Sequence, residues 1–115
     1  MQYLLMIYAN ENAFSTMTQA EQKQGMAAYT AYTAALREAG ALKDSNRLQP
    51  TATATTVRVA NGKSQVLNGP YTEAKEQFGG YFLIEAPDLD AALTWAARCP
   101  GAAHGVDEVR PVWSM

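Results

Sequence analysis

Two short runs of the sequence are apolar on both alternating faces, residues 3–8 (YLLMIY) and, but for one Glu, residues 81–86 (YFLIEA). Runs of this kind predict strands in the middle of a sheet, where both faces are covered. Residues 42–48 and 107–113 are expected as further strands. The two apolar runs therefore belong at the centre of the predicted sheet.

A β-hairpin is predicted between residues 53 and 67. Residues 53–60 alternate and are rich in β-branched side chains, residues 63–67 return, and Asn61-Gly62 between them favours a two-residue turn. One face of this hairpin is expected to be apolar and the other mostly polar. The turn predicts three cross-strand pairs, which are Val57 with Val66, Val59 with Ser64, and Arg58 with Gln65.

Two helices are predicted by their caps and by the spacing of apolar residues. Thr18 and Glu21 have the spacing of a capping box, at the start of a helix that runs to about Ala39. Asp88 is a good N-cap for a second helix, which Pro100-Gly101 ends. Residues 10–16 are expected to be a loop. The expected core faces are Met26, Tyr29, Thr33 and Leu36 in the first helix, and Leu89, Ala92, Leu93 and Ala96 in the second.

The predicted order is strand, helix, strand with its hairpin, strand, helix, strand. This order is typical of an α+β, ferredoxin-like βαββαβ sheet with an extra hairpin. Right-handed crossovers place both helices on one face, so the other face of the central strands is apolar and uncovered. Because a large apolar patch is rarely left in water, we expect a homodimer that pairs through this sheet face.

Residues 68–85 (NGPYTEAKEQFGGYFLIE) hold a turn, a charged segment and a strand. The Asn-Gly-Pro sequence at 68–70 predicts a bend. Residues 72–77 predict about one turn of helix, which the glycine pair at 79–80 ends before the apolar run. A helix this short depends on tertiary contacts, so we expect its charged residues to be anchors rather than a catalytic set. The residues assigned to this structural motif are Gly69, Pro70, Glu73, Lys75, Glu76, Gly79 and Gly80.

The composition is that of one ordinary soluble domain over residues 1–115. The chain is 48% hydrophobic and 17% charged, with a formal net charge of −2. The single Cys99 excludes an internal disulfide, and the absence of an export or bilayer-spanning pattern predicts a cytoplasmic protein. Because Lys and Arg do not exceed Asp and Glu, neither nucleic acid nor a membrane is an expected partner.

Several motifs together point to a known family. They are residues 3–8, Leu48-Gln49-Pro50, residues 53–58, the NGPY sequence at 68–71, Glu73, Lys75-Glu76, Gly79-Gly80 and the EVRP sequence at 108–111. On these motifs the chain resembles the YCII-related, or DGPF-domain, family of small bacterial proteins along nearly its whole length. The resemblance implies a ferredoxin-like fold that pairs into a dimeric α/β barrel, with no established activity.

This chain departs from the family pattern at two motif positions, where Asn68 stands for Asp and Tyr71 for Phe. In the related YCII branch a His and Asp pair is the suspected catalytic machinery. Here the first predicted helix offers Tyr29 and Tyr32 in place of a His. Both members of that pair are therefore missing.

Residues for nucleophilic, metal or nucleotide chemistry are sparse. The only histidine, His104, is predicted in a glycine-flanked loop, and Cys99 is expected to be a small, inert, buried thiol. No spacing of His and Cys offers three metal ligands, and neither a phosphate loop nor a dinucleotide fingerprint is present. We therefore expect no metal and no cofactor.

What remains is binding or acid–base chemistry on the open face of the sheet. Glu85 lies on an otherwise apolar strand, while Glu108 and Arg110 share one face of the last strand. Charges in such places are either paired or functional. One alternative is a bridge from Arg110 to a carboxylate that pins the edge strand or the dimer, and the other is a ligand pocket. The ligand-binding candidates are Tyr8, Arg58, Asn68, Tyr71, Glu85, Glu108 and Arg110.

Two functions fit these observations. The first is a homodimeric module that binds a small polar ligand or serves a regulatory role, in keeping with the missing acid–base pair. The second is a cofactor-independent enzyme of the isomerase, lyase or hydrolase type, acting on a small polar molecule in the barrel cleft. A cleft that gathers Tyr8, Glu85 and Arg110 favours a site, whereas a packed, dry sheet face favours the module.

Overall fold

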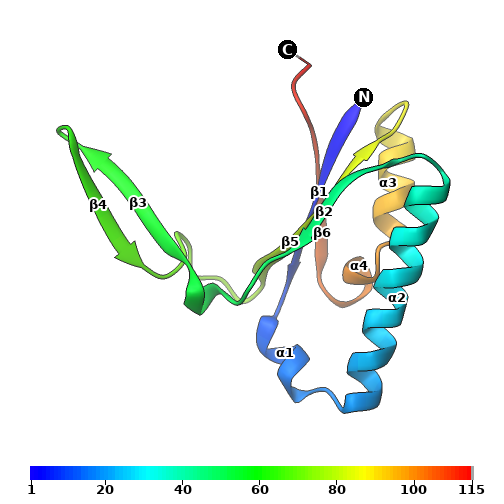
Figure 1. Ribbon diagram of the computed structural model, residues 1–115, viewed down its shortest axis with the longest axis horizontal. Helices are drawn as coiled ribbons and strands as arrows, with labels where there is room; N and C mark the ends of the chain where they lie inside the picture. Colours follow the sequence, from blue (N-terminus) through cyan, green and yellow to red (C-terminus); the bar gives the residue numbers. More distant parts are fainter. Residues whose placement is uncertain (115) are drawn as a thin grey trace.

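A computed structural model describes residues 1–114 of the chain. The main sheet is built from two strand–helix–strand units, and a strand pair is inserted between its second and third strands (Figure 1). The elements are β1 (Gln2–Ala9), α1 (Glu11–Thr16), α2 (Gln19–Glu38), β2 (Leu42–Arg47), the short 3-10 helix η1 (Thr51–Thr53), β3 (Thr55–Ala60), β4 (Lys63–Asn68), β5 (Gln77–Glu85), α3 (Leu89–Arg98), α4 (Pro100–His104) and β6 (Val106–Pro111).

The main sheet has four strands in the order β2-β5-β1-β6, and every neighbouring pair is antiparallel. The two apolar runs form β1 and β5 and lie in the middle, as predicted. This order confirms the α+β, ferredoxin-like arrangement expected for one subunit of a dimeric α/β barrel. No helix within residues 1–114 is long and apolar enough to cross a membrane.

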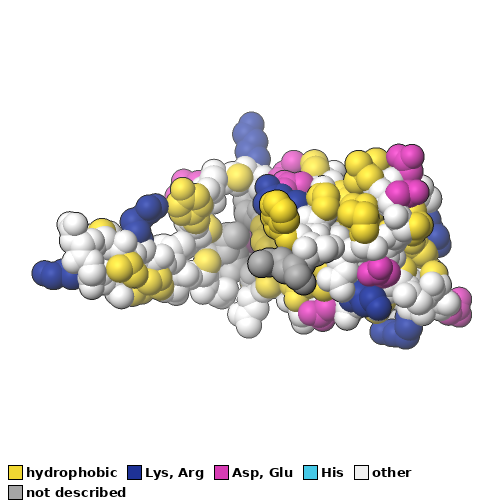
Figure 2. Space-filling view, turned by 90° about the horizontal axis from the view of Figure 1, so that it is seen from above, with side chains coloured by type: hydrophobic (Ala, Val, Ile, Leu, Met, Phe, Trp, Pro, Cys, Tyr) yellow, Lys and Arg dark blue, Asp and Glu magenta, His cyan; other side chains and the backbone are white. Residues whose placement is uncertain are grey.

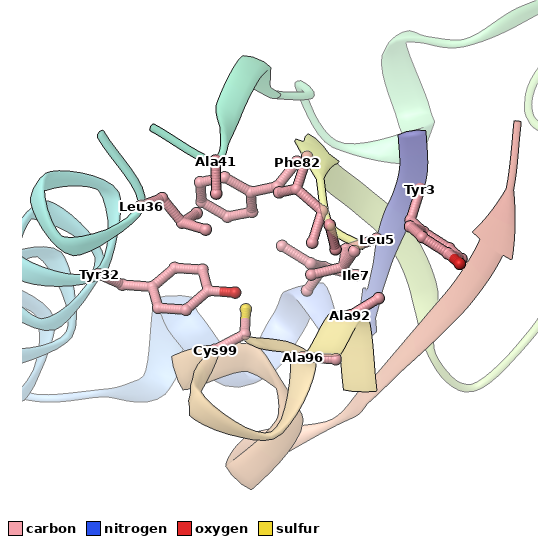
Figure 3. Packing of buried hydrophobic residues seen from close by; sticks show 12 residues of the cluster. Tyr3, Leu5, Ile7, Tyr32, Leu36, Ala41, Phe82, Ala92, Ala96 and Cys99 are labelled. Carbon is pink, nitrogen blue, oxygen red and sulfur yellow. The ribbon is translucent and has the colours of Figure 1, made fainter. Parts of the chain in front are cut away.

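The two long helices, α2 and α3, cover the same face of the sheet. The core lies between these helices and the sheet (Figures 1 and 3). Leu5 of β1, Leu36 of α2 and Ile84 of β5 are completely buried there. The helix starts are as predicted: Thr18 and Glu21 form both hydrogen bonds of a capping box, and the Asp88 carboxylate accepts a hydrogen bond from the Ala91 N–H.

The predicted helix faces are correct only in part. Met26 was expected in the core but is 60% exposed, because the sheet lies under only the C-terminal half of α2. Tyr32, which was not predicted there, is buried beside Leu36. In α3 the small residues Ala92 and Ala96 face the sheet, while Leu89 and Leu93 are about half exposed.

Two segments expected as loop contain short helices. Residues 10–16 form α1 after Asn10, whose side chain accepts a hydrogen bond from the Asn12 N–H as a helix cap. The second predicted helix, α3, ends before Pro100 as expected, but Pro100 then begins the short helix α4, since a proline at the first helical position loses no helical hydrogen bond. His104 is the last residue of that helix and not a loop residue.

The predicted helix at residues 72–77 is wrong. Residues 71–76 are bends and irregular chain, and β5 begins at Gln77 and continues through both glycines. The pairing with β1 shifts at this point, from Ile7 opposite Gly80 to Tyr8 opposite Phe78, so Gly79 is the extra residue of a bulge. A Cβ on Gly80 would lie 3.0 Å from the Asn46 carbonyl oxygen, so the close strand contact favours glycine there.

The β3–β4 hairpin, residues 55–68, which we call the arm, pairs only with itself. Asn61 and Gly62 both have positive φ, as a two-residue hairpin turn of this kind requires, and the three predicted pairs are confirmed. The arm extends from the body on the side of the sheet opposite the helices (Figure 1). It contributes to a radius of gyration of 16.1 Å, against about 13 Å for a compact chain of this length.

Candidate functional site

The candidate site lies on the open face of the main sheet, which is the face turned away from α2 and α3. Alternation along β1 puts Leu5 and Ile7 in the core and leaves Leu4, Met6 and Tyr8 on the open face. These three side chains are only half-buried. The residues paired with them on the neighbouring strands lie on the same face, and they include Tyr81 and Leu83 of β5 and Val106, Glu108 and Arg110 of β6.

A groove of about 470 Å³ opens on this face where β1 and β6 meet the irregular segment before β5. The Tyr8 ring lies beside the Phe78 ring, with centroids 5.4 Å apart and planes tilted by 39°. The bulge at Gly79 makes this contact possible, because it brings Phe78 to the same face as Tyr8. The groove is lined by Tyr8, Ala74, Lys75, Glu76, Val106 and Glu108.

The groove therefore offers one phenol hydroxyl, one ammonium and two carboxylates beside an aromatic wall. Such a set can donate hydrogen bonds to an anionic or carbonyl oxygen through Lys75 and Tyr8, and accept them from hydroxyl groups through Glu76 and Glu108. No His or Cys side chain lines it. Among residues 1–114, no three His, Cys, Asp or Glu side chains gather closely enough to hold a metal ion.

A cleft that gathers Tyr8, Glu85 and Arg110, the arrangement that would favour a site, does not form. Glu85 pairs with Gln2, six residues along β1 from Tyr8, which is about 20 Å of strand. There its carboxylate accepts a hydrogen bond of 2.7 Å from the N-terminal ammonium, which holds the pKa of Glu85 below its usual value. Glu85 also lines a second depression of about 350 Å³, together with Met1, Gln2, Val112, Trp113 and Ser114.

Glu108 and Arg110 share the open face, as predicted, and their side chains approach each other at 3.7 Å. Both are well exposed, so this ion pair contributes little stability. Glu108 lines the groove, whereas Arg110, two residues further along β6 on the same face, does not.

The remaining candidates lie on or near the arm, away from the groove lining. Arg58 is exposed on the polar face of the arm, and Asn68 pairs with Thr55 where the arm meets the body. Tyr71 follows that junction and is 83% exposed. Tyr29 and Tyr32, which stand where the resemblance suggested a histidine, belong to the core, and the Tyr32 hydroxyl donates to the Trp95 carbonyl oxygen. Burial raises the pKa of both phenols.

Lys75 and Glu76 were assigned a structural role from the sequence, but they line the groove. Both are exposed, as is Glu73, and the ion pairs within residues 1–114 involve other residues. An anchoring network is therefore not formed inside one chain. The sequence signal that pointed to a site here is the group of charged residues in the 72–77 segment, which is too short to be stable as a helix.

Asp107 is a half-buried residue with a shielded carboxylate that the sequence analysis missed. Both carboxylate oxygens are shielded from solvent, and no group within residues 1–114 donates a well-formed hydrogen bond to them. Burial raises the pKa of Asp107, and the nearby Cys99 thiol lowers it only in part. Cys99 is buried as expected, and burial, followed by the charge of Asp107, raises the pKa of its thiol to about 12. The signal was available, because a residue next to outward-facing Glu108 must face the helices.

Known proteins support the fold and define the family. The sequence model of the YCII-related domain matches residues 1–115. An uncharacterised protein of Rhizobium meliloti (strain 1021) is 36% identical over 114 residues, covering 97% of this chain and 92% of that protein.

Among solved structures, one similar to this chain is 5-chloro-2-hydroxyhydroquinone dehydrochlorinase from Burkholderia phenoliruptrix AC1100, in complex with 2,5-dihydroxybenzoquinone. The TM-score is 0.56 at 16% identity, over 99% of this chain and 94% of that one, and likeness at this identity shows the fold alone. The match along the whole sequence, the similar relative and the shared fold lead to one conclusion: this chain belongs to the YCII-related domain family.

Proposed function

We propose that this protein is a small-molecule-binding module that works as a homodimer, with its ligand held in the open-face groove. The observation that supports this proposal is the groove itself, in which Tyr8, Lys75 and Glu108 meet on a sheet face that no helix covers. A single chain leaves the groove wide open to water. A second copy packed on the half-buried residues Leu4, Met6 and Leu83 would cover that face and enclose the ligand.

The chemistry of the lining suggests a small, flat ligand with several oxygen atoms. The Tyr8 and Phe78 rings provide an apolar wall against which a planar molecule can stack. Lys75 favours a carbonyl or anionic oxygen, while Glu76 and Glu108 favour hydroxyl groups. The dihydroxybenzoquinone bound by the similar dehydrochlorinase has this character, which makes it a reasonable first probe for the present groove.

The test is a titration of the isotopically labelled protein with 2,5-dihydroxybenzoquinone, followed by NMR. We expect saturable shifts of the amides of Tyr8, Lys75, Val106 and Glu108. Lys75→Ala should weaken binding about tenfold, and Lys43→Ala, an exposed lysine on β2, should not. Native mass spectrometry of freshly purified protein provides an independent search for a bound molecule. Shifts confined to the helices or the arm would refute the assignment of the site.

A second candidate function is a cofactor-independent enzyme acting in the same groove. It is favoured by the phenol of Tyr8 lying among carboxylates, since these groups can transfer protons, and by the activity of the similar dehydrochlorinase. The two functions differ in what happens to a bound compound over time. New signals from the probe that grow with time, and that Tyr8→Phe abolishes, would favour the enzyme; an unchanged bound probe would favour the module.

A further inference from the structure

The arm has one face with three valines and one mostly polar face, which also carries an exposed leucine, and both faces are exposed. Val57, Val59 and Val66 lie together on the apolar face and are 61–65% exposed. Arg58 and Lys63 lie on the other face. Strands patterned in this way normally have their apolar face covered and their polar face in water. A two-stranded hairpin with no cover is also only marginally stable.

Hydrogen bonds close the base of the arm and hold the segment before it against α1. At its base, the Gly69 N–H donates to the Ala54 carbonyl oxygen at 2.7 Å. Before the base, both the N–H and the hydroxyl of Thr51 donate to the Glu11 carboxylate on α1. The arm projects away from the sheet on its open-face side, and Figure 2 shows its tip, with dark blue and yellow side chains, standing clear of the body.

The charge of the arm is opposite to that of the rest of the chain. Arg58 and Lys63 are its only charged residues, so the arm contributes +2 to a formal net charge of −2 and the remainder carries −4. An arm of one copy is therefore attracted to the body of another. The basic arms, placed against the partner's acidic body, would also reduce the repulsion between the two acidic bodies.

We propose that the arm is a clasp that holds a second copy of this chain, with Val57, Val59 and Val66 packed on the partner. This inference rests on the homodimer proposed above. Each copy has one uncovered arm and one uncovered sheet face on the same side, so a two-fold pair covers both without a third component. Three valines alone expose far less than the roughly 800 Å² per partner of a standard interface, so arm and sheet face are needed together.

The experiment is sedimentation of the full chain over a dilution series at about 0.5 M salt, where long-range charge effects are screened. The triple variant Val57→Thr, Val59→Thr, Val66→Thr keeps the β-branched shape and replaces one methyl group at each site with a hydroxyl. We expect it to raise the dimer Kd at least about tenfold. The control is Gln65→Thr, an uncharged change on the other face of the arm, which should keep the wild-type Kd.

The outcomes separate the two proposals. A wild-type chain that stays monomeric at about 100 μM would refute both the homodimer and the clasp. A wild-type dimer whose Kd is unchanged in the valine variant would refute the clasp and leave the sheet-face dimer standing. A valine variant that dissociates, with circular dichroism like that of the wild type and an unaffected control, would support the clasp.

Discussion

Replacing Asp107 with asparagine should make this protein more stable at neutral pH. The side chain points from β6 into the helix-covered core, where Tyr29, Tyr32 and Cys99 are its titratable neighbours and Gly101 packs close to it. A Cβ on Gly101 would lie only 3.3 Å from the Asp107 Oδ1 atom. Asp107→Asn has nearly the same shape as the native side chain and removes the charge, so it perturbs little else.

The sign of the pH effect follows from the direction of the pKa shift. Burial raises the pKa of Asp107 above its ordinary value of 3.8, so the folded chain holds this proton more tightly than the unfolded chain. The stability associated with the protonated carboxyl is fully present below pH 3.8 and is lost as the pH rises through the folded pKa. Above that range the ionised side chain is a net cost.

The magnitude follows from the unpaired oxygens. An unsatisfied buried polar group costs about 1–3 kcal/mol, and more when it is charged. The amide of Asp107→Asn is also unpaired but is neutral, so we expect a gain of about 1 kcal/mol at pH 8. For a domain of this size that is a rise in Tm of about 4 °C. At pH 3 the two proteins should melt together.

The assay is thermal unfolding of both proteins between pH 3 and pH 8 at one fixed protein concentration, because any dimer makes Tm concentration-dependent. Glu38→Gln, on the exposed end of α2, is the control and should shift Tm little at any pH. A variant that is equally stable at pH 3 and less stable at pH 8 would mean that the ionised Asp107 makes a favourable contact. The net cost assigned to its buried charge would then be wrong.

Four further substitutions test other parts of the structure. Gly25→Ala in α2 should stabilise the fold by up to about 1 kcal/mol in urea unfolding, because the added methyl meets no atom within 4 Å; a loss would contradict this view of the helix. Gly105→Ala should cost about 2 kcal/mol or more, since its Cβ would clash with the Tyr8 carbonyl oxygen, and a variant with wild-type stability would disprove that contact. Glu11→Gln should cost about 1 kcal/mol and speed hydrogen exchange of the Thr51 amide; unchanged exchange would show that the arm base is held in another way. Lys75→Ala should change stability by less than about 0.5 kcal/mol, and a loss near 2 kcal/mol would restore the anchoring role first expected for this residue.

The features that sequence predicted well are those fixed by neighbouring residues. The capping box at Thr18 and Glu21 and the hairpin register set by Asn61-Gly62 depend on a few adjacent side chains, and both are present in the structure. The central position of β1 and β5 also follows directly from their apolar runs. Local chemistry is sufficient for such features because no distant part of the chain competes with it.

The features that failed depend on distant partners. Residues 72–77 have helical propensity, but one turn cannot nucleate by itself, and pairing with β1 extends Gln77 into β5 instead. The position of Met26 depended on how far the sheet extends under α2, which helical spacing alone does not show. The groove combines residues from β1, the irregular segment and β6, so its members were found singly as Tyr8 and Glu108 but not as a set.

The bulge at Gly79 has a consequence for how such a groove can change between related proteins. Strict alternation from Tyr81 would put Phe78 on the helix side of the sheet, and the one extra backbone residue transfers its ring to the groove beside Tyr8. Which aromatic rings line the groove therefore depends on the number of residues in β5 as well as on the identity of its side chains. Gain or loss of a single residue near this point can exchange an aromatic ring between the interior and the open face while the side chains from Gly80 onward keep their places.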